Sequence, residues 1–314
     1  MKQDYWTYNK PLSMTGLGGG ATSLQNAGGG SNIVTDGLAF HVDAGNPLSY
    51  SGSGYQVNSL VGSINNNNGG SYDGTITHTA ASGSNPAYFS YPNNVTFGQV
   101  FASSDFDIIT YPSFSMDCWI NIGTGGLATN YGRILGLKRH AYSPGSVGDT
   151  NAANTRLTSV WLDSSSGNNP AISWTHYYAG GGNSGSGFDT SQVVSPSMGT
   201  GGWKQNKWFH FAVVNERLNN NSGSRRYYVD GQRTTDQYGN QSNYTSFFYS
   251  ATRNPASPNN NGTFYLYLGG SEGSGGYQSR FHGDYSIYRF YKNKVLSDAE
   301  VTLNWNAQKA LFGR

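Results

Sequence analysis

Residues 281–301 read FHGDYSIYRFYKNKVLSDAEV, an aromatic-rich apolar run followed at once by a helix start. Within it, the Ser297 hydroxyl can accept from the Glu300 backbone N–H, and the Glu300 carboxylate can reach back to the Ser297 N–H. This reciprocal arrangement is a capping box, which marks the first turn of a helix. The stretch therefore predicts one short helix, from about Asp298 to Asn306, near the end of the chain.

From residue 36 onward, short apolar runs alternate with polar loops rich in Gly, Ser and Asn. The run Trp208–Asn215 carries apolar side chains on both faces, which is typical of a central strand covered on both sides. Asp230-Gly231 ends another such run and is a strong hairpin signal. Strands are expected at 37–43, 88–101, 106–109, 114–122, 133–137, 157–162, 171–178, 208–215, 225–232 and 263–269, and long polar loops at 49–85, 179–202 and 235–262.

The composition agrees with an all-β chain. Of 314 residues, 44 are Gly, only 11% are charged and 14% are aromatic, so turns are plentiful and a core can still form. The longest basic cluster is Arg225-Arg226, which predicts no nucleic-acid partner. No apolar run approaches the roughly 18 residues of a membrane span. The single cysteine, Cys118, lies in an apolar run and is expected to be buried.

The C-terminal stretch resembles the closing segment of laminin-G-like, concanavalin A-like jelly-roll domains. The runs at 208–214 and 228–231 resemble two central strands of that family, and the matches together cover most of 36–314. The resemblance implies an antiparallel two-sheet jelly-roll sandwich with one short C-terminal helix. The closing-segment positions that match the family pattern are Gly283, Arg289, Tyr291, Leu296, Ser297 and Glu300.

Residues 1–35 differ from this domain and are expected to form an extended glycine-rich arm. Two Gly-Gly-Gly runs give little reason for one conformation, whereas Tyr5, Trp6 and Tyr8 are costly to leave in water. We interpret these three aromatics as anchors that dock the arm on a partner or on its own domain 36–314. The alternative interpretation is a disordered leader.

The sequence predicts no enzymatic activity. Sandwich-fold glycosidases need two carboxylates about 5–10 Å apart facing one sugar, and the Glu-x-Asp-x-(x)-Glu pattern of jelly-roll glycanases is missing. Of the three glutamates, Glu300 is explained by the helix cap. The six histidines have no zinc-site spacing. No metal site or cofactor is predicted. A calcium site is left open as an alternative without support, since no converging set of carboxylates can be mapped.

Aromatic residues in or near the long polar loops are the remaining functional signal. Tyrosine and tryptophan offer large amphipathic contact areas, which suit both sugar stacking and protein interfaces. The alternative is that many of them pack the loops onto the sandwich. The candidate glycan-binding residues are Trp174, Tyr177, Tyr178 and Tyr277.

The opening stretch 37–54 resembles a subset of the family that is common in structural proteins of tailed bacteriophages. The sequence begins at Met1 without the apolar core of a signal peptide. These features favour a virion surface protein, made in the host cytoplasm, on the capsid or on the tail or baseplate. Its expected partners are other virion proteins, in an oligomeric arrangement, and a host surface polysaccharide. The alternatives are a carbohydrate-binding adhesin or lectin of a cell surface and, third, a glycan hydrolase.

Overall fold

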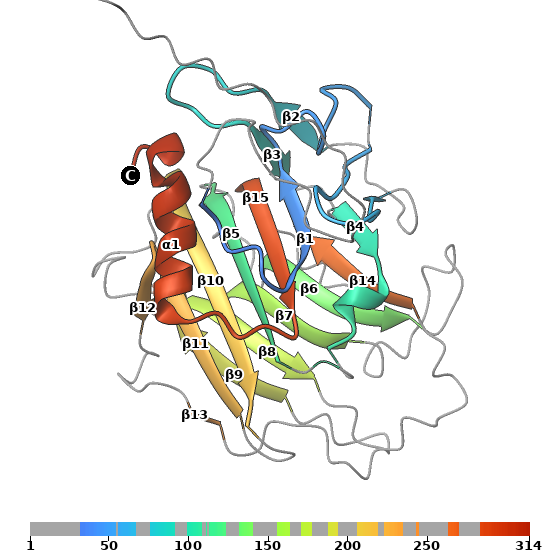
Figure 1. Ribbon diagram of the computed structural model, residues 1–314, viewed down its shortest axis with the longest axis vertical. Coiled ribbons are helices and arrows are strands. Elements are labelled where there is room, and N and C mark those ends of the chain that lie inside the picture. Colours follow the sequence, from blue (N-terminus) through green and yellow to red (C-terminus); the bar gives the residue numbers. More distant parts are fainter. Residues whose placement is uncertain are drawn as a thin grey trace, which may run out of the picture.

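Two antiparallel sheets pack face to face in the computed structural model (Figure 1). For the strands at 156–163, 171–177, 188–193 and 243–244, the structure describes the backbone pairing and not the side chains. The residues that the structure describes are 32–54, 56–66, 76–91, 99–108, 111, 113–123, 132–140, 156–163, 171–177, 188–193, 206–218, 223–234, 243–244, 263–269 and 283–314.

The larger sheet has nine strands in the order β12-β11-β10-β5-β15-β3-β2, with β1 also paired to β15 and β13 to β11. The central strand β15 thus pairs with β5 on one side and with both β1 and β3 on the other. Its strands are β1 (Leu38–Asp43), β2 (Thr77–Thr79), β3 (Tyr88–Tyr91), β5 (Phe114–Ile122), β10 (Trp208–Arg217), β11 (Gly223–Val229), β12 (Gln232–Thr234), β13 (Asn243–Tyr244) and β15 (Gly283–Lys292).

The smaller sheet has six strands in the order β4-β14-β6-β7-β8-β9. These are β4 (Gln99–Ala102), β6 (Gly132–His140), β7 (Arg156–Asp163), β8 (Ala171–Tyr177), β9 (Phe188–Val193) and β14 (Thr263–Leu268). The described helical segments are the 3-10 turn η2 (Ser104–Phe106), the α-helix α1 (Asp298–Gln308) and the 3-10 turn η6 (Lys309–Phe312).

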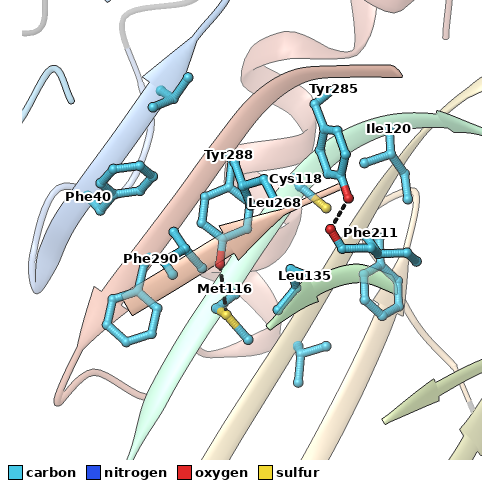
Figure 2. Packing of buried hydrophobic residues seen from close by; sticks show 14 of the residues in the cluster. Phe40, Met116, Cys118, Ile120, Leu135, Phe211, Leu268, Tyr285, Tyr288 and Phe290 are labelled. Carbon is cyan, nitrogen blue, oxygen red and sulfur yellow. Dashed lines mark hydrogen bonds between the residues drawn. The ribbon is translucent and has the colours of Figure 1, made fainter. Parts of the chain in front are cut away.

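Apolar side chains from both sheets form the main core (Figure 2). The Phe40 ring meets the Phe101 ring edge to face, with centroids 4.7 Å apart, a favoured geometry for aromatic pairs. Tyr288 and Met116 face each other from neighbouring strands, and the Tyr288 hydroxyl donates to the Met116 Sδ at 2.9 Å. Cys118 is buried in the same core, as predicted from its apolar run.

Helix α1 covers the outer face of the nine-stranded sheet, beside β10 (Figure 1). Phe211 and Val213 point into the main core, whereas Ala212 and Val214 contact the cluster under the helix, which includes Val301. The strand β10 is therefore buried on both faces, which confirms its prediction as a central, doubly covered strand.

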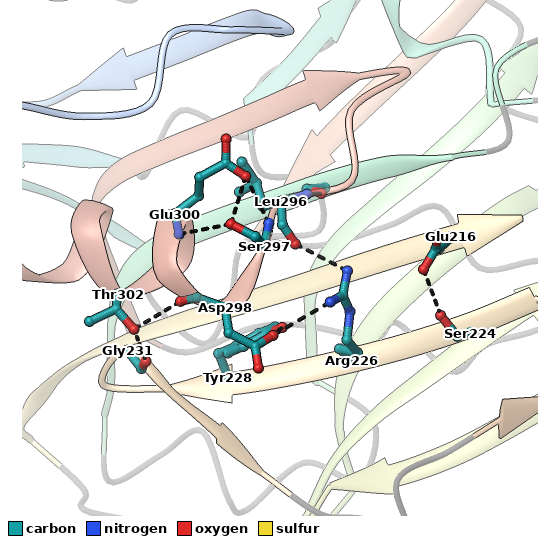
Figure 3. Close-up of polar contacts among 11 residues, drawn as sticks. Glu216, Ser224, Arg226, Tyr228, Gly231, Leu296, Ser297, Asp298, Glu300 and Thr302 are labelled. Atoms are coloured by element: carbon teal, nitrogen blue, oxygen red, sulfur yellow. Dashed lines mark hydrogen bonds and ion pairs between the residues drawn. The ribbon is translucent and has the colours of Figure 1, made fainter.

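The helix start is fixed as the sequence predicts (Figure 3). The Ser297 hydroxyl accepts from the Glu300 N–H at 3.2 Å, and the Glu300 carboxylate accepts from the Ser297 N–H at 2.8 Å. The Tyr228 hydroxyl on β11 donates to the Asp298 carboxylate at 2.5 Å, so the first turn is also tied to the sheet. The helix continues to Gln308, two residues beyond the predicted end.

The predicted all-β sandwich with a short C-terminal helix is confirmed, but two expected strands and three expected loops are wrong. The expected strand 88–101 is two strands in different sheets, β3 and β4, separated by the turn formers Pro92-Asn93-Asn94. The expected strand 106–109 overlaps the 3-10 turn η2, where the Ser103 hydroxyl accepts from the Asp105 N–H at 3.0 Å. The expected loops 49–85, 179–202 and 235–262 contain β2, β9 and β13, because backbone pairing does not require an apolar sequence.

Within the described residues, no helix is both long and apolar enough to cross a membrane.

Two glycines test how closely the backbone packs against the buried Tyr91 ring. Gly269 and Gly54 have nearly the same left-handed φ, 78° and 77°. A Cβ on Gly269 would lie 2.2 Å from the ring of the buried Tyr91, whereas one on Gly54 would meet nothing within 4 Å. We expect Gly54→Ala to lower the free energy of unfolding by about 1 kcal/mol through φ strain, and Gly269→Ala by about 3 kcal/mol through added overpacking. Urea unfolding measures both, and equal losses would contradict this account of the Tyr91 contact.

Candidate functional site

A fully buried ion pair lies between the nine-stranded sheet and α1. Asp117 on β5 and Arg289 on β15 are register partners, and Asp117 Oδ1 is 2.8 Å from Arg289 Nε with both side chains 0% exposed. His210 on β10 lies beside them, with Nε2 3.8 Å from Asp117 Oδ1. Burial alone would raise the pKa of Asp117, but the Arg289 guanidinium, His210 and Asn304 together hold that pKa below its ordinary value.

Helix α1 supplies amides that complete this pair. The Asn304 Nδ2 donates to Asp117 Oδ2 at 2.6 Å, and Gln308 Oε1 accepts from Arg289 and, at 3.2 Å, from Trp119 Nε1. The two amide residues lie four positions apart on one helix face. Because these groups are buried, the cluster docks the helix on the sheet and is closed to a ligand.

Two titratable groups of β1 lie at the edge of this cluster. Burial lowers the pKa of His41 to about 3, and the neighbouring Arg289 charge adds to the shift. Neither ring nitrogen of His41 has a hydrogen-bond partner among the described residues. Burial raises the pKa of Asp43 to about 6, although a hydrogen bond from the Gly45 N–H opposes this shift. As the pH falls, His41 therefore lowers the free energy of unfolding, whereas Asp43 raises it.

His41 gives a pH dependence of known sign. Its folded pKa lies below its ordinary value of 6.5, so its contribution to stability is present above pH 6.5 and is lost as the pH falls toward 3. We expect the free energy of unfolding of the wild type, minus that of His41→Gln, to fall by about 1 kcal/mol per pH unit below pH 6.5. Denaturant unfolding at pH 7.5, 6, 5 and 4 measures the difference. Asp43, whose raised pKa favours the folded state at low pH, is present in both proteins, so its effect cancels in the difference. If the stability of both proteins changed equally with pH, the low pKa assigned to His41 would be contradicted.

A series of aromatic rings leads from this buried cluster to the surface. Trp119 stacks on Phe312 of η6, with centroids 4.0 Å apart and planes 3° apart. Trp208 packs against Phe312 at 5.3 Å, and Tyr88 of β3 lies 5.8 Å from Trp208 with the planes tilted by 56°. Trp119 and Phe312 are buried, whereas Trp208 and Tyr88 are partly exposed. The buried Phe312 ring therefore supports the partly exposed Trp208 ring, which in turn contacts the Tyr88 ring.

A polar row crosses the sheet on the same face as these rings. Trp208 pairs with Asn121, Asn121 with Asp284, Asp284 with Ser90 and Ser90 with Thr77, so the five residues are successive register partners on five strands. The Asn121 Nδ2 donates to Asp284 Oδ2 at 3.1 Å. Thr77 is exposed, and the other members of the row are partly buried.

The two exposed rings reach toward each other above this row. Strands β10 and β3 are separated by β5 and β15, which corresponds to about 14 Å at about 4.8 Å per strand. Since the ring centroids of Trp208 and Tyr88 are only 5.8 Å apart, both side chains lean across the intervening strands. We call Tyr88, Trp208, Asn121 and Asp284 the platform.

The platform offers two kinds of contact. Tryptophan and tyrosine faces bind the C–H faces of flat ligands, and a carboxylate accepts hydrogen bonds from hydroxyl groups. The Asn121 amide oxygen is buried, so Asn121 acts by holding the Asp284 carboxylate. Among the described residues, no group of three or more His, Cys, Asp or Glu side chains could hold a metal ion. The platform can therefore bind a flat ligand that carries hydroxyl groups.

The predicted site residues do not form this platform. Trp174 and Tyr177 lie in β8, where their register partners include Val160 and Phe188, and the placement of their side chains is not described. The other predicted site residues, Tyr178, Tyr277, Tyr5, Trp6 and Tyr8, lie outside the described residues.

The platform residues carry no motif in the sequence. Trp208 was expected only as a strand residue, and Tyr88, Asn121 and Asp284 are spread over three further strands. Their proximity depends on cross-strand register, which the sequence does not reveal. The available signal was the position of Trp208 at the very start of the clearest strand.

No protein-family profile matches the chain, and no curated protein sequence matches it. A solved structure of Trypanosoma rangeli sialidase, in complex with 2,3-difluoro-KDN, matches 94% of this chain with a TM-score of 0.52 and 16% identity. The two proteins share a β-sandwich fold. This chain spans 36% of the length of that sialidase. The receptor-binding domain of botulinum neurotoxin type G matches 86% of this chain and 51% of its own, at 13% identity and a TM-score of 0.43.

The prediction that the chain is not an enzyme is contradicted by this comparison. It rested on the missing carboxylate pair of jelly-roll glycanases, and a protein that contains the same fold is a sialidase. A missing pattern from one class of enzyme therefore does not exclude catalysis by a chain of this fold. At 16% identity, the likeness shows the fold and assigns no reaction.

Proposed function

We propose that the chain binds carbohydrate and that the platform is its binding surface. The observation that carries this proposal is the partly exposed Trp208–Tyr88 pair, which lies above the hydrogen-bonded Asn121–Asp284 pair. Sugars have an apolar C–H face and a rim of hydroxyl groups, which match the two kinds of contact that the platform offers. The shared fold with a sialidase that binds a sugar-acid derivative supports the same ligand class.

Removal of the Trp208 ring tests the platform. We expect Trp208→Ala to weaken binding to the best ligand of an oligosaccharide array by about tenfold or more, which is about 1.4 kcal/mol, because the ring supplies most of the stacking area. The matched control is Tyr111→Ala, which removes a partly exposed ring that contacts Lys292 elsewhere on the surface. Array screening followed by calorimetry measures the affinities. Equal affinities of both variants would contradict a binding role for the platform.

We further propose that this carbohydrate-binding chain is a surface subunit of a tailed-bacteriophage virion, on the capsid or on the tail or baseplate. The resemblance of residues 37–54 to phage structural proteins supports this placement. The arm would dock the chain on other virion proteins, and the sandwich would contact a host surface polysaccharide. The alternative is an adhesin or lectin module of a cell surface, with the same ligand class.

Docking through the arm is tested by deletion. Val34 is buried and its N–H donates to Asn304 Oδ1 at 2.8 Å, so we expect a variant that lacks residues 1–31 to melt like the full chain. We expect this variant, and the triple substitution of Tyr5, Trp6 and Tyr8 by Ala, to be lost from purified virions, because aromatic anchors commonly contribute about 2 kcal/mol or more each at interfaces. Co-sedimentation of tagged protein with virions gives the readout. Normal incorporation of both variants would overturn docking by the arm, and absence of the full chain from virions would favour the cell-surface alternative.

A further inference from the structure

We propose that Asp43 is a further binding residue of the platform, and that sugars carrying a carboxylate bind there only while Asp43 is protonated. The inference rests on the proposed carbohydrate-binding function. It goes beyond that function by adding a residue to the binding surface and by naming the class of sugar that this residue controls.

Strand register places Asp43 next to Tyr88. Strands β1 and β3 both pair with β15, and β1 ends with Asp43 opposite Ile287. On β3, Phe89 lies opposite Tyr285, and Tyr88 precedes it as the first residue of the strand. The end of β1 and the start of β3 therefore meet at the same position along β15.

A close approach in the turn after β1 supports this proximity. A Cβ on Gly45 would lie 3.3 Å from Asp43 Oδ1 and 3.8 Å from the Cβ of Ala87. Because Ala87 directly precedes Tyr88 in the chain, the carboxylate lies beside the strand that carries this ring.

Asp43 also shares the outer face of the sheet with the platform. Phe40 and Val42 point into the main core, and side chains alternate along a strand, so Asp43 points outward. Its register partner Ile287 belongs to the buried cluster against which Trp208 packs. The carboxylate therefore lies on the same face as both exposed rings.

The Asp43 carboxylate has hydrogen-bonding capacity that the fold does not use. The residue is half-buried, and its Oδ1 accepts from the Gly45 N–H at 2.8 Å. Within the described residues, this is the one hydrogen bond that the carboxylate makes. A carboxylate has about four acceptor positions on its two oxygens, so hydroxyl groups of a bound sugar can use the others.

The Asp43 carboxylate changes its charge close to neutral pH. Burial raises the pKa of Asp43 to about 6, although the Gly45 N–H and the Arg289 charge oppose this shift. Asp43 is therefore mostly protonated at pH 5 and mostly ionised at pH 7.

The other titratable or charged groups around Asp43 belong to β1, β2 and β15. Arg289 and Asp284 lie on β15, and His41 lies on β1. His78 of β2 is close to the turn that follows Asp43, because its Nε2 lies 2.9 Å from the backbone oxygen of residue 44. The two histidines are the groups whose titration an experiment must separate from that of Asp43.

The two forms of Asp43 treat neutral and acidic sugars differently. A sugar hydroxyl both donates and accepts hydrogen bonds, so neutral sugars can bind either form. The ionised form repels a ligand carboxylate, whereas the protonated form donates a charge-assisted hydrogen bond to it. Acidic sugars should therefore bind more tightly as the pH falls through about 6, and neutral sugars should not.

The test compares the full chain with Asp43→Asn, which keeps one acceptor oxygen and removes the titration. The probes are hexamers of glucose, galactose and mannose, and the corresponding hexamers of glucuronic, galacturonic and mannuronic acid. Calorimetry at constant ionic strength measures their affinities at pH 5, 6, 7 and 8. Asp36→Asn, which removes a carboxylate paired with Lys294 before the start of β1, is the matched control. His41→Gln and His78→Gln are measured alongside.

We expect the wild-type affinity for at least one acidic hexamer to fall about tenfold per pH unit above pH 6. Affinities for the neutral hexamers should change by less than about twofold over the same range, because their hydroxyls can pair with either form of Asp43. Asp43→Asn should bind the acidic hexamer equally well at every pH, and the three other variants should behave like the wild type.

Three results would overturn this inference while Trp208→Ala still weakens binding of a neutral hexamer. These are pH dependence that persists in Asp43→Asn, pH dependence that disappears in either histidine variant, and acidic hexamers that bind equally at every pH or at none. Absence of binding to every hexamer, neutral or acidic, would overturn the proposed function itself.

Discussion

The Asp117–Arg289 ion pair is the constraint on which the outer half of the structure depends. Two charges removed from water are costly unless hydrogen bonds satisfy their remaining positions. Asn304 of α1 donates to Asp117, and Gln308 of α1 accepts from Arg289, so the helix provides two of these hydrogen bonds. Loss of either charge would leave the other buried and unpaired, which typically costs about 3–5 kcal/mol. The helix is therefore held by specific polar contacts as well as by its apolar face.

The same contacts connect the interior to the platform. Gln308 accepts from Trp119, Trp119 stacks on Phe312, and Phe312 packs against Trp208. The position of the helix thus determines the orientation of the exposed tryptophan. Because the Trp208 ring packs against the buried Phe312 ring, little freedom of the Trp208 side chain would be lost when a flat ligand binds.

The sequence contained enough local information to predict most of the fold. The capping box at Ser297, the Asp230-Gly231 hairpin and the doubly apolar strand at Trp208–Asn215 each follow from patterns within ten residues. The strands β2, β9 and β13 were missed because their largely polar sequences match those of loops. The division of 88–101 was missed because the apolar residues at its two ends were taken as one run, whereas β3 and β4 belong to different sheets.

The site was less accessible to sequence analysis than the fold. The platform joins strands from positions 88 to 284, and its members become neighbours only through register across β3, β5, β10 and β15. His210, one of the six histidines without zinc-site spacing, is buried beside Asp117. The aromatic side chains chosen from loop composition were selected without any knowledge of which face they occupy. Composition led to the hypothesis of a glycan ligand but not to the platform that we propose as its binding surface.

The place of β15 in the nine-stranded sheet has a consequence for synthesis and folding. This strand lies between β5 and the β1–β3 side, yet it comes after all other strands in the chain. Its pairing with β1 joins residues about 250 positions apart, such as His41 and Arg289, and such long-range pairing slows folding. Until residues 283–292 have been made, β1 lacks its pairing partner and β5 is paired on one side alone, with β10. A chain interrupted before this point would expose unpaired strand edges, which promote aggregation, so truncated products of this protein should be insoluble rather than merely inactive.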